Sequence, residues 1–301
     1  MVVRVGIQEV GGAQRERLAY IDFRLYFLGA VSRSDISARF GVASAAATRD
    51  LARYRALAPD NILFDARTKT YLIGECFKPV FEHPIERVLS ALSMGFGDGL
   101  GGAPMGLVPC EFPISITRPS IETLAVVSRA IRARSALRIS YVSSTSGLSE
   151  RVILPFALVD NGLRWHTRAF DRKTSSFRDF ALTRIVAADL AEGVAVPAEE
   201  PGSDIQWSRL VELELVPHPY AQRPELAALD YPMVDGKLRI VARAALAGYV
   251  LRRWSVDCSP DHSLHSPDYR LWLRDSLALY GVESAAIAPG YVPPTEVRER
   301  G

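Results

Sequence analysis

Apolar and polar positions alternate along this chain with two different periods. Before residue 138, most apolar side chains recur every three or four positions, which is the spacing of one face of a helix. From residue 138 to residue 190 they recur at every second position, in short runs separated by the turn sequences STSG, DNG and RKTS. These runs predict short strands. Beyond residue 205 both periods occur, so the whole pattern predicts an α+β protein of several domains.

The first helical segments have the lengths of a DNA-binding helix-turn-helix. Residues 14–31 predict a helix with a broad apolar face. Ser32 or Ser34 caps a short helix that Gly41 ends, because glycine tolerates a positive φ. Ser44 caps a second helix. Its inner face carries apolar residues at i, i+4 and i+7: Ala47, Leu51 and Tyr54.

The outer face of this second helix favours contact with DNA. Small residues at the helix start let it lie deep in a major groove, where Thr48 and Arg49 reach base edges or phosphate and Arg53 reaches phosphate. The next segment predicts a two-stranded hairpin with a basic tip, like the wing of a winged helix-turn-helix. The predicted DNA-binding residues are Ser44, Ala45, Thr48, Arg49, Arg53, Arg67, Lys69 and Thr70. The alternative is a helical hairpin whose arginines are only solvated.

Composition changes divide the chain into domains. A first domain covers residues 1–96 and ends in a connecting helix. A Gly- and Pro-rich linker follows over residues 97–118. A second domain, 119–197, consists of one helix and the short strands, which predict a small, strongly bent barrel of the Sm/SH3-like kind. Strands and helices alternate in a third domain, 205–287, which predicts a small α/β sandwich with a last helix near residues 269–281.

Cationic side chains gather on the predicted barrel. His166 and Arg168 lie two residues apart on one strand and therefore point to one face. Together with an aromatic ring and a hydroxyl, arginines suit phosphates and nucleobases. The predicted ligand-binding residues are Tyr141, Ser143, His166, Arg168, Arg178 and Arg184. In the alternative, the last two arginines form structural ion pairs with nearby aspartates: Asp171, Asp179 and Asp189. Trp165 and Phe180 are expected in the barrel core, and Trp254 in the packing of the third domain.

Charge is distributed unevenly over a chain whose net charge is only +2. Residues 1–78 carry a net +4 and residues 118–197 a net +5, whereas residues 79–117 and 198–301 carry −3 and −4. Two basic segments indicate two separate anion-facing surfaces. The alternative is that arginine simply replaces lysine on solvated faces.

The residues give little support to other classes of protein. No GxSxG, HExxH or P-loop sequence occurs, which predicts a protein that is not an enzyme. Three scattered cysteines and five histidines with no close acidic partners predict neither a disulfide framework nor a metal site, and no cofactor is expected. No run of about 18 apolar residues and no signal-peptide core occur. We therefore expect a cytoplasmic protein without a membrane partner.

The strand region resembles a WYL domain. The resemblance rests on the run from ISYVS through RVILPFALV to LRWHTRAFD and FRDFALTRI, in which Trp165 stands at the tryptophan of the motif. His166 and Thr167 replace its tyrosine and leucine. The chain is similar to WYL-domain transcriptional regulators of the BrxR/CapW type, which are associated with phage-defence systems. Their order of winged helix-turn-helix, WYL domain and C-terminal WCX domain covers nearly the whole chain.

The resemblance implies a ligand-responsive repressor. In that family the positions of the predicted ligand-binding set are implicated in sensing a nucleic-acid or nucleotide-like effector, and the regulated genes belong to a phage-defence operon. Since one recognition helix reads only a few base pairs, we expect a homodimer on an inverted-repeat operator in double-stranded DNA. The competing hypothesis is a nucleic-acid-binding accessory protein without operator-specific regulation.

Overall fold

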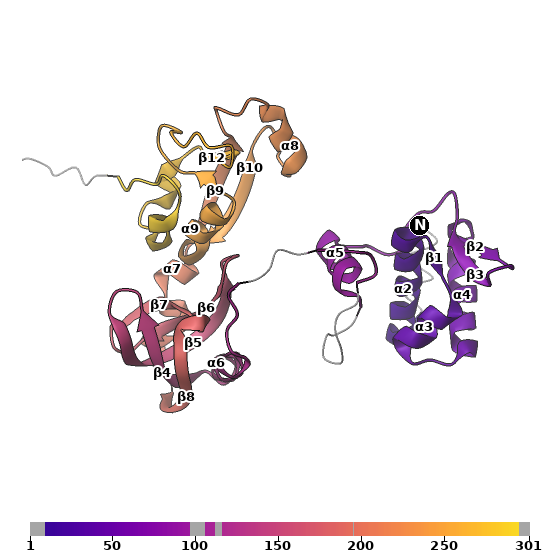
Figure 1. The fold of residues 1–301 in the computed structure, drawn as a ribbon, viewed down its shortest axis with the longest axis horizontal. Helices are drawn as coiled ribbons and strands as arrows, with labels where there is room; N and C mark the ends of the chain where they lie inside the picture. The colour runs from indigo at the N-terminus through magenta and orange to yellow at the C-terminus, as the bar shows by residue number, and fades with distance from the viewer. Residues whose placement is uncertain (1–9, 97–105, 112–115, 195, 295–301) are drawn as a thin grey trace, which may run out of the picture. The chain divides into compact units, whose positions relative to one another are not determined.

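The computed structural model describes residues 10–96, 106–111, 116–194 and 196–294 (Figure 1). The chain forms two compact units, Met1–Pro113 and Ile114–Gly301, and each is described by itself. Of the linker predicted over 97–118, residues 97–105 and 112–115 lie outside the described part.

The first unit consists of helices and one small sheet. Its elements are α2 Gly12–Leu28, β1 Ala30–Val31, α3 Arg33–Phe40, α4 Ser44–Leu57, η1 Pro59–Asn61, β2 Ile62–Asp65, β3 Thr70–Ile73 and α5 Ile85–Met94. The sheet has the order β1-β3-β2 and is antiparallel throughout. The core is made by apolar residues of the first three helices: Leu18, Ile21, Leu25, Ile36, Leu51 and Tyr54. Helix, turn, helix and hairpin thus follow one another as the sequence predicts.

Of the caps predicted for α3 and α4, those of α3 are confirmed and the N-terminal cap of α4 is not. Ser32 begins α3: its side chain accepts a hydrogen bond from the backbone N–H of Asp35, whose carboxylate accepts one from the backbone N–H of Ser32. Gly41 ends α3 with a φ of 63°. The predicted cap of α4 is wrong. Ala43 has the extended backbone of the capping residue, and Ser44 is the first residue of the helix.

The second unit begins with a helix packed on a five-stranded sheet, here called the WYL sheet. Its elements are α6 Ile121–Ala133, β4 Ser135–Ser143, β5 Gly147–Asp160, β6 Trp165–Asp171, β7 Ser176–Ala181, η2 Leu182–Arg184 and β8 Ile185–Val194. The sheet is antiparallel with the order β7-β6-β5-β4-β8. The predicted Sm/SH3-like barrel is therefore wrong. The turn η2 carries the chain from the edge strand β7 to the opposite edge, where β8 pairs with β4, and the sheet stays open.

The core of this sheet confirms one aromatic prediction and contradicts another. Apolar residues from α6 and four strands fill it: Val127, Leu137, Ile139, Ile153, Ala169 and Phe180. Phe180 is buried, as predicted. Trp165, predicted in the core, is 44% exposed, because it is the first residue of β6 and pairs there with Asp160, the last residue of β5.

The rest of the second unit is a smaller two-layer α/β structure. Its main elements are α7 Ile205–Ser208, β9 Leu210–Pro217, α8 Ala227–Asp230, β10 Leu238–Arg243, α9 Ala244–Arg253, β11 Val256–Asp257, β12 Leu271–Leu273, η6 Ser276–Leu279 and η7 Glu283–Ile287. The sheet has the order β10-β9-β12-β11, and only the β11–β12 pair is parallel. Ala247 and Leu251 of α9 pack against Leu213 and Leu215 of β9. Figure 1 shows α7 between this part and the WYL sheet.

Two predictions for this C-terminal part are wrong. The expected last helix near residues 269–281 is the strand β12 followed by the short 3-10 helix η6. Leu271 and Leu273 are both buried beside β9, so their spacing of two residues marks a strand. Trp254, expected in the packing, is 54% exposed. Among the described residues, no helix is long and apolar enough to cross a membrane.

Candidate DNA-binding face and ligand pocket

Helix α4 presents an exposed basic face with small neighbours. Ala45, Thr48, Arg49, Ala52 and Arg53 are all exposed, as the sequence predicts. The Thr48 hydroxyl donates a hydrogen bond to the carbonyl oxygen of Ser44, 2.9 Å away. Within the described part of the chain, neither arginine has a carboxylate partner. Both guanidinium groups are therefore available to phosphates or base edges.

Two buried acids fix α4 against the rest of the first unit. Asp50 accepts hydrogen bonds from Arg17 Nε at 2.6 Å and Gln14 Nε2 at 2.8 Å, both on α2. The Tyr54 hydroxyl donates to Asp22 at 2.5 Å, and burial raises the pKa of Tyr54 well above its usual value, so it remains a donor. Sequence reasoning missed these two acids, Asp22 and Asp50. The only sign of them in the sequence is that each stands on an otherwise apolar helix face. They hold the exposed face in one orientation.

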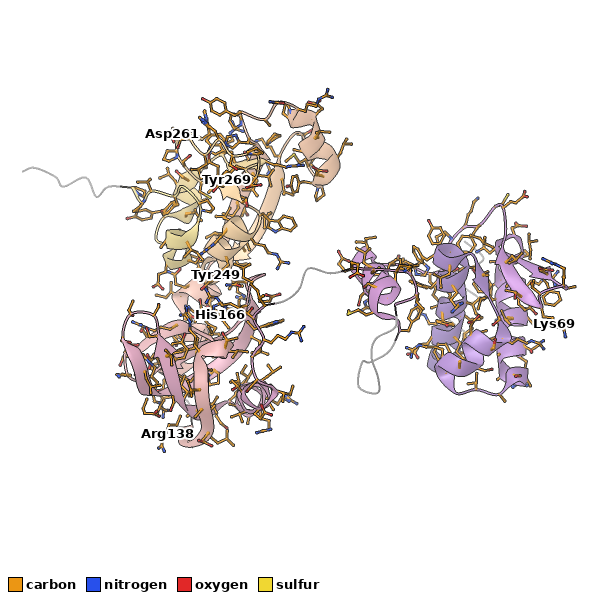
Figure 2. All side chains as sticks on the ribbon, in the orientation of Figure 1. Lys69, Arg138, His166, Tyr249, Asp261 and Tyr269 are labelled. Carbon is orange, nitrogen blue, oxygen red and sulfur yellow. The ribbon has the colours of Figure 1, made fainter. Side chains whose placement is uncertain are left out.

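The hairpin of β2 and β3 carries its cations at the tip. Arg67 and Lys69 are exposed, Thr70 is half-buried, and Figure 2 shows Lys69 at the outer end of the hairpin. Asp65 orders the turn by accepting hydrogen bonds from the backbone N–H of Arg67 and the hydroxyl of Thr68. The Thr68 hydrogen bond is the main reason that the pKa of Asp65 is lowered. The turn therefore projects cations, as a wing does.

A cavity of about 470 Å³ lies between the WYL sheet and helix α9, inside the second unit. One wall comes from β4, β6, β7, η2 and the turn before β6. The other comes from α9 and Ile287. Four arginines line it: Arg164, Arg184, Arg252 and Arg253. In the part of the chain that the structure describes, none of the four is paired with a carboxylate.

His166 and Tyr249 face each other across this cavity, which we call the interdomain pocket. Their ring centroids are 5.8 Å apart, and Figure 2 shows both at the boundary of the two parts. Burial lowers the pKa of His166, so the ring is neutral at neutral pH. Burial raises the pKa of Tyr249, whose hydroxyl donates to Asp179 at 3.1 Å. The pocket thus combines a neutral imidazole, a phenol and several cations.

Arg168 lies beside the pocket in a buried ion cluster. It donates through Nε and Nη2 to Asp204 at 2.8 and 3.1 Å, and through Nη1 to Asp179 at 3.3 Å. Asp204 also caps α7. The side chain of Arg168 is 5% exposed, so its guanidinium is fully engaged in joining the WYL sheet to α7.

The structure brings together half of the predicted ligand-binding set. Tyr141, His166 and Arg184 line the interdomain pocket, whereas Arg168 is held by aspartates behind it. The remaining two lie elsewhere: Ser143 bonds to Thr145 in the β4–β5 turn, and the exposed Arg178 bonds to Ser176. Among the lining residues that sequence reasoning missed are Arg164, Tyr249, Arg252 and Arg253. The sequence signal for the last two is only that they are adjacent arginines in a segment of alternating strands and helices.

The described residues were also compared with the needs of a metal ion. Within the described ranges, no group of three histidine, cysteine or acidic side chains is placed to hold a metal ion. The chemistry offered is therefore recognition of an anion by arginines, rings and hydroxyl groups.

A helix-turn-helix with a basic wing, followed in the chain by an open five-stranded WYL sheet, defines a DNA-binding transcriptional regulator of the WYL class. Three family profiles match: the BrxR transcriptional regulator winged helix-turn-helix domain over residues 13–94, the WYL domain over residues 122–190, and the BrxR transcriptional regulator C-terminal dimerization domain over residues 210–279. The chain belongs to the CapW family of DNA-binding transcriptional repressors. That family is one of regulators, which confirms the expectation that the protein is not an enzyme.

The relatives cover most of the chain. The DNA-binding transcriptional repressor CapW of Escherichia coli (strain KTE188) is 33% identical over 85% of this chain and 88% of that protein. CapW of Pseudomonas aeruginosa is 34% identical over 82% and 84%, and CapW of Stenotrophomonas maltophilia is 33% identical over 84% and 86%. Among solved structures, proteasome accessory factor B/C of Arthrobacter aurescens is 19% identical over 78% of this chain and 44% of its own, with a TM-score of 0.25. That likeness is too low to carry an argument.

Proposed function

We propose that this protein is a homodimeric repressor that binds an inverted-repeat operator through α4 and the wing. The observation that carries the proposal is the exposure of Arg49 and Arg53, which have no carboxylate partner among the described residues, on a helix fixed by buried acids. The contacts come from Ser44, Ala45, Thr48, Arg49 and Arg53 of α4 and from Arg67, Lys69 and Thr70 of the wing. The regulated genes belong to a phage-defence operon, as the resemblance to BrxR/CapW-type regulators implies.

The three parts of the chain have separate roles in this proposal. Residues 1–96 bind DNA, residues 119–197 sense an effector and residues 205–287 dimerise. The match of residues 210–279 to a dimerization domain supports the last assignment. Dimerisation also fits the geometry of recognition, because one helix reads few base pairs and two symmetric copies are needed for useful specificity.

The effector is a nucleic-acid-like anion bound in the interdomain pocket. Tyr141, His166 and Arg184 are the members of the predicted set that line it. Their chemistry supports the assignment, since a guanidinium, an imidazole and a phenol suit a phosphate and a base. Effector binding changes the affinity of the dimer for its operator.

The test of operator binding uses DNA from upstream of the protein's own gene. We expect specific binding that weakens with salt, and the variant Arg49→Ala/Arg53→Ala should bind more weakly and lower the salt slope by about 2, because two phosphate or base contacts are lost. The matched control is Arg129→Ala/Arg132→Ala, which removes two exposed arginines from α6. Equal affinity of the first variant and the wild type would discard the assignment of α4.

The accessory-protein alternative makes a different prediction for the same assay. A protein without operator-specific regulation binds unrelated single strands as tightly as the upstream duplex, because only backbone phosphates and stacked bases are read. A clear preference for the duplex excludes this alternative.

A further inference from the structure

The interdomain pocket has a charge imbalance that the fold itself does not neutralise. Arg164 and Arg184 are half-buried on the side of the WYL sheet, and Arg252 and Arg253 lie on α9 at the rim. The acid that lines the pocket, Asp179, already accepts hydrogen bonds from Arg168 and Tyr249. Four cations thus converge from two structural parts, and within the described residues none of them is paired with a carboxylate.

Unused hydrogen-bonding atoms point to a missing polar partner. In the described part of the chain, the buried Nδ1 of His166 and the buried Nε of Arg164 have no hydrogen-bond partner. Only 7% of His166 is exposed, and it lines the pocket. Leaving such atoms unpaired costs free energy, so native structures rarely do so without a ligand or water to complete them. Both atoms belong to residues that a bound anion would touch.

The side chain of Arg253 ties the two walls together. It lies across Gly162, where a Cβ atom would be only 2.8 Å from Arg253 Cδ. Gly162 has a φ of 83° and forms the turn before β6. The side chain of Arg253, although exposed, therefore lies against the turn before β6 on the WYL-sheet side of the pocket.

We propose that the interdomain pocket is a composite site for a compact diphosphate-bearing ligand of nucleotide size, bound jointly by the WYL sheet and α9. Arginines on both walls bind the phosphates, and the base or sugar lies against His166 and Tyr249. A cavity of about 470 Å³ is near the lower end of the range that holds small ligands, about 300 to 1,000 Å³. It is large enough for one nucleotide, but it is not the continuous groove that a long single strand requires.

The composite construction specifies how the ligand acts. Binding neutralises cations that face one another across the boundary, and so it stabilises the docking of α9 on the WYL sheet. Helix α9 lies within the region that matches a dimerization domain. Occupancy of the pocket is thereby linked to the part of the chain that joins the two copies. The inference thus deepens the proposed function by naming the class of the effector, and its regulatory consequence rests on that function.

The site is tested with full-length protein by isothermal titration calorimetry. The probes are adenosine diphosphate, inorganic pyrophosphate, uncharged adenosine and a single-stranded oligothymidylate. We expect both diphosphates to bind, more weakly at higher salt, and adenosine not to bind. Arg253→Gln and Arg184→Gln should each weaken the binding of adenosine diphosphate about tenfold or more, because each removes a charge-assisted contact. Arg138→Gln, an exposed arginine on β4 outside the pocket, should bind like the wild type.

Several results overturn the inference. They are no binding of either diphosphate, binding of the oligothymidylate alone, and an equal loss in Arg138→Gln. If Arg184→Gln weakens binding and Arg253→Gln does not, the site belongs to the WYL sheet alone and is not composite. A rise in the melting temperature of the wild type with adenosine diphosphate, lost in Arg253→Gln, supports it.

Operator binding by the same ligand-free preparations separates this inference from the proposed function. Operator binding without diphosphate binding sinks the inference alone. Diphosphate binding without operator binding supports the composite site and sinks the proposed repressor.

Discussion

Two kinds of arginine in the second unit have opposite environments although they lie close together in the sequence. Arg168 is enclosed by Asp179 and Asp204, and it joins the WYL sheet to α7. Arg164 and Arg184, one on either side of it in the sequence, reach no carboxylate in the described structure and line a cavity. Neighbouring arginines of one sheet therefore take different roles. An arginine that aspartates reach stabilises the fold, and an arginine that they do not reach is available to bind a ligand.

The same division explains why His166 and Arg168 share a face of β6 but not a role. Both are buried. His166 faces the interdomain pocket, whereas Arg168 faces the aspartates. Asp179 is the link, because it accepts from Arg168 on one side and from Tyr249 on the other. A substitution in the ion cluster should therefore mainly change the free energy of unfolding. A substitution in the pocket should mainly change the affinity for the ligand.

The largest effect is expected for Arg168→Met. Removing one partner of a buried ion pair leaves Asp204 uncompensated, and we expect a loss of about 3–5 kcal/mol of unfolding free energy. All four tryptophans lie in the second unit, so tryptophan fluorescence during urea denaturation reports on this unit alone. Arg138→Met, at an exposed position of the same sheet, is the control. A loss no greater than in the control would contradict the role of the ion cluster.

A smaller loss is expected for Tyr249→Phe. The change removes the hydroxyl that donates to Asp179, while Arg168 still neutralises that carboxylate. One hydrogen bond to a charged acceptor corresponds to about 1.5 kcal/mol. Urea denaturation followed by tryptophan fluorescence measures it, with Tyr280→Phe, at an exposed tyrosine, as the control. If Tyr249→Phe lost as much unfolding free energy as Arg168→Met, Tyr249 would belong to the ion cluster and not to the pocket.

How far the sequence predicts this molecule depends on how local each feature is. The cap at Ser32, the turn at Gly41 and the alternation in the strands involve residues a few positions apart, and they are confirmed. Whether the strands close into a barrel depends on where β8 pairs, which no local pattern encodes. Periodicity also does not say which end of a strand is covered, and this is why the exposure of Trp165 was not predicted.

The candidate site was predictable only in part for the same reason. Tyr141 and His166 lie on strands and Arg184 lies in the turn η2, so all three belong to the region that the sequence assigns to one domain. The partner of Arg168 is Asp204, thirty-six residues later in the sequence, and α9 contributes its arginines from still further along the chain. Charge patterns reveal that cations are present. They do not reveal which of them find an acid after folding.

The pH dependence of stability distinguishes the pocket from the ion cluster. Burial lowers the pKa of His166, and the nearby Arg164 and Arg184 lower it further while Asp179 opposes them. A depressed pKa contributes stability above the unfolded value of about 6.5, and this stability is lost as pH falls through the folded pKa. We expect His166→Asn to flatten the fall in urea stability between neutral and mildly acidic pH. An unchanged slope would mean that His166 is not a titrating part of the pocket.

The smallest effect on stability is expected for Arg184→Met. This arginine lines the pocket beside Arg164 and has no carboxylate partner within the described residues. Its removal relieves repulsion and breaks no ion pair, so the unfolding free energy should change by no more than about 0.5 kcal/mol. Urea denaturation followed by tryptophan fluorescence measures this directly, with Arg168→Met alongside as the contrasting change. A loss of several kcal/mol would place Arg184 in the structural group, and the pocket would then have three available cations in place of four.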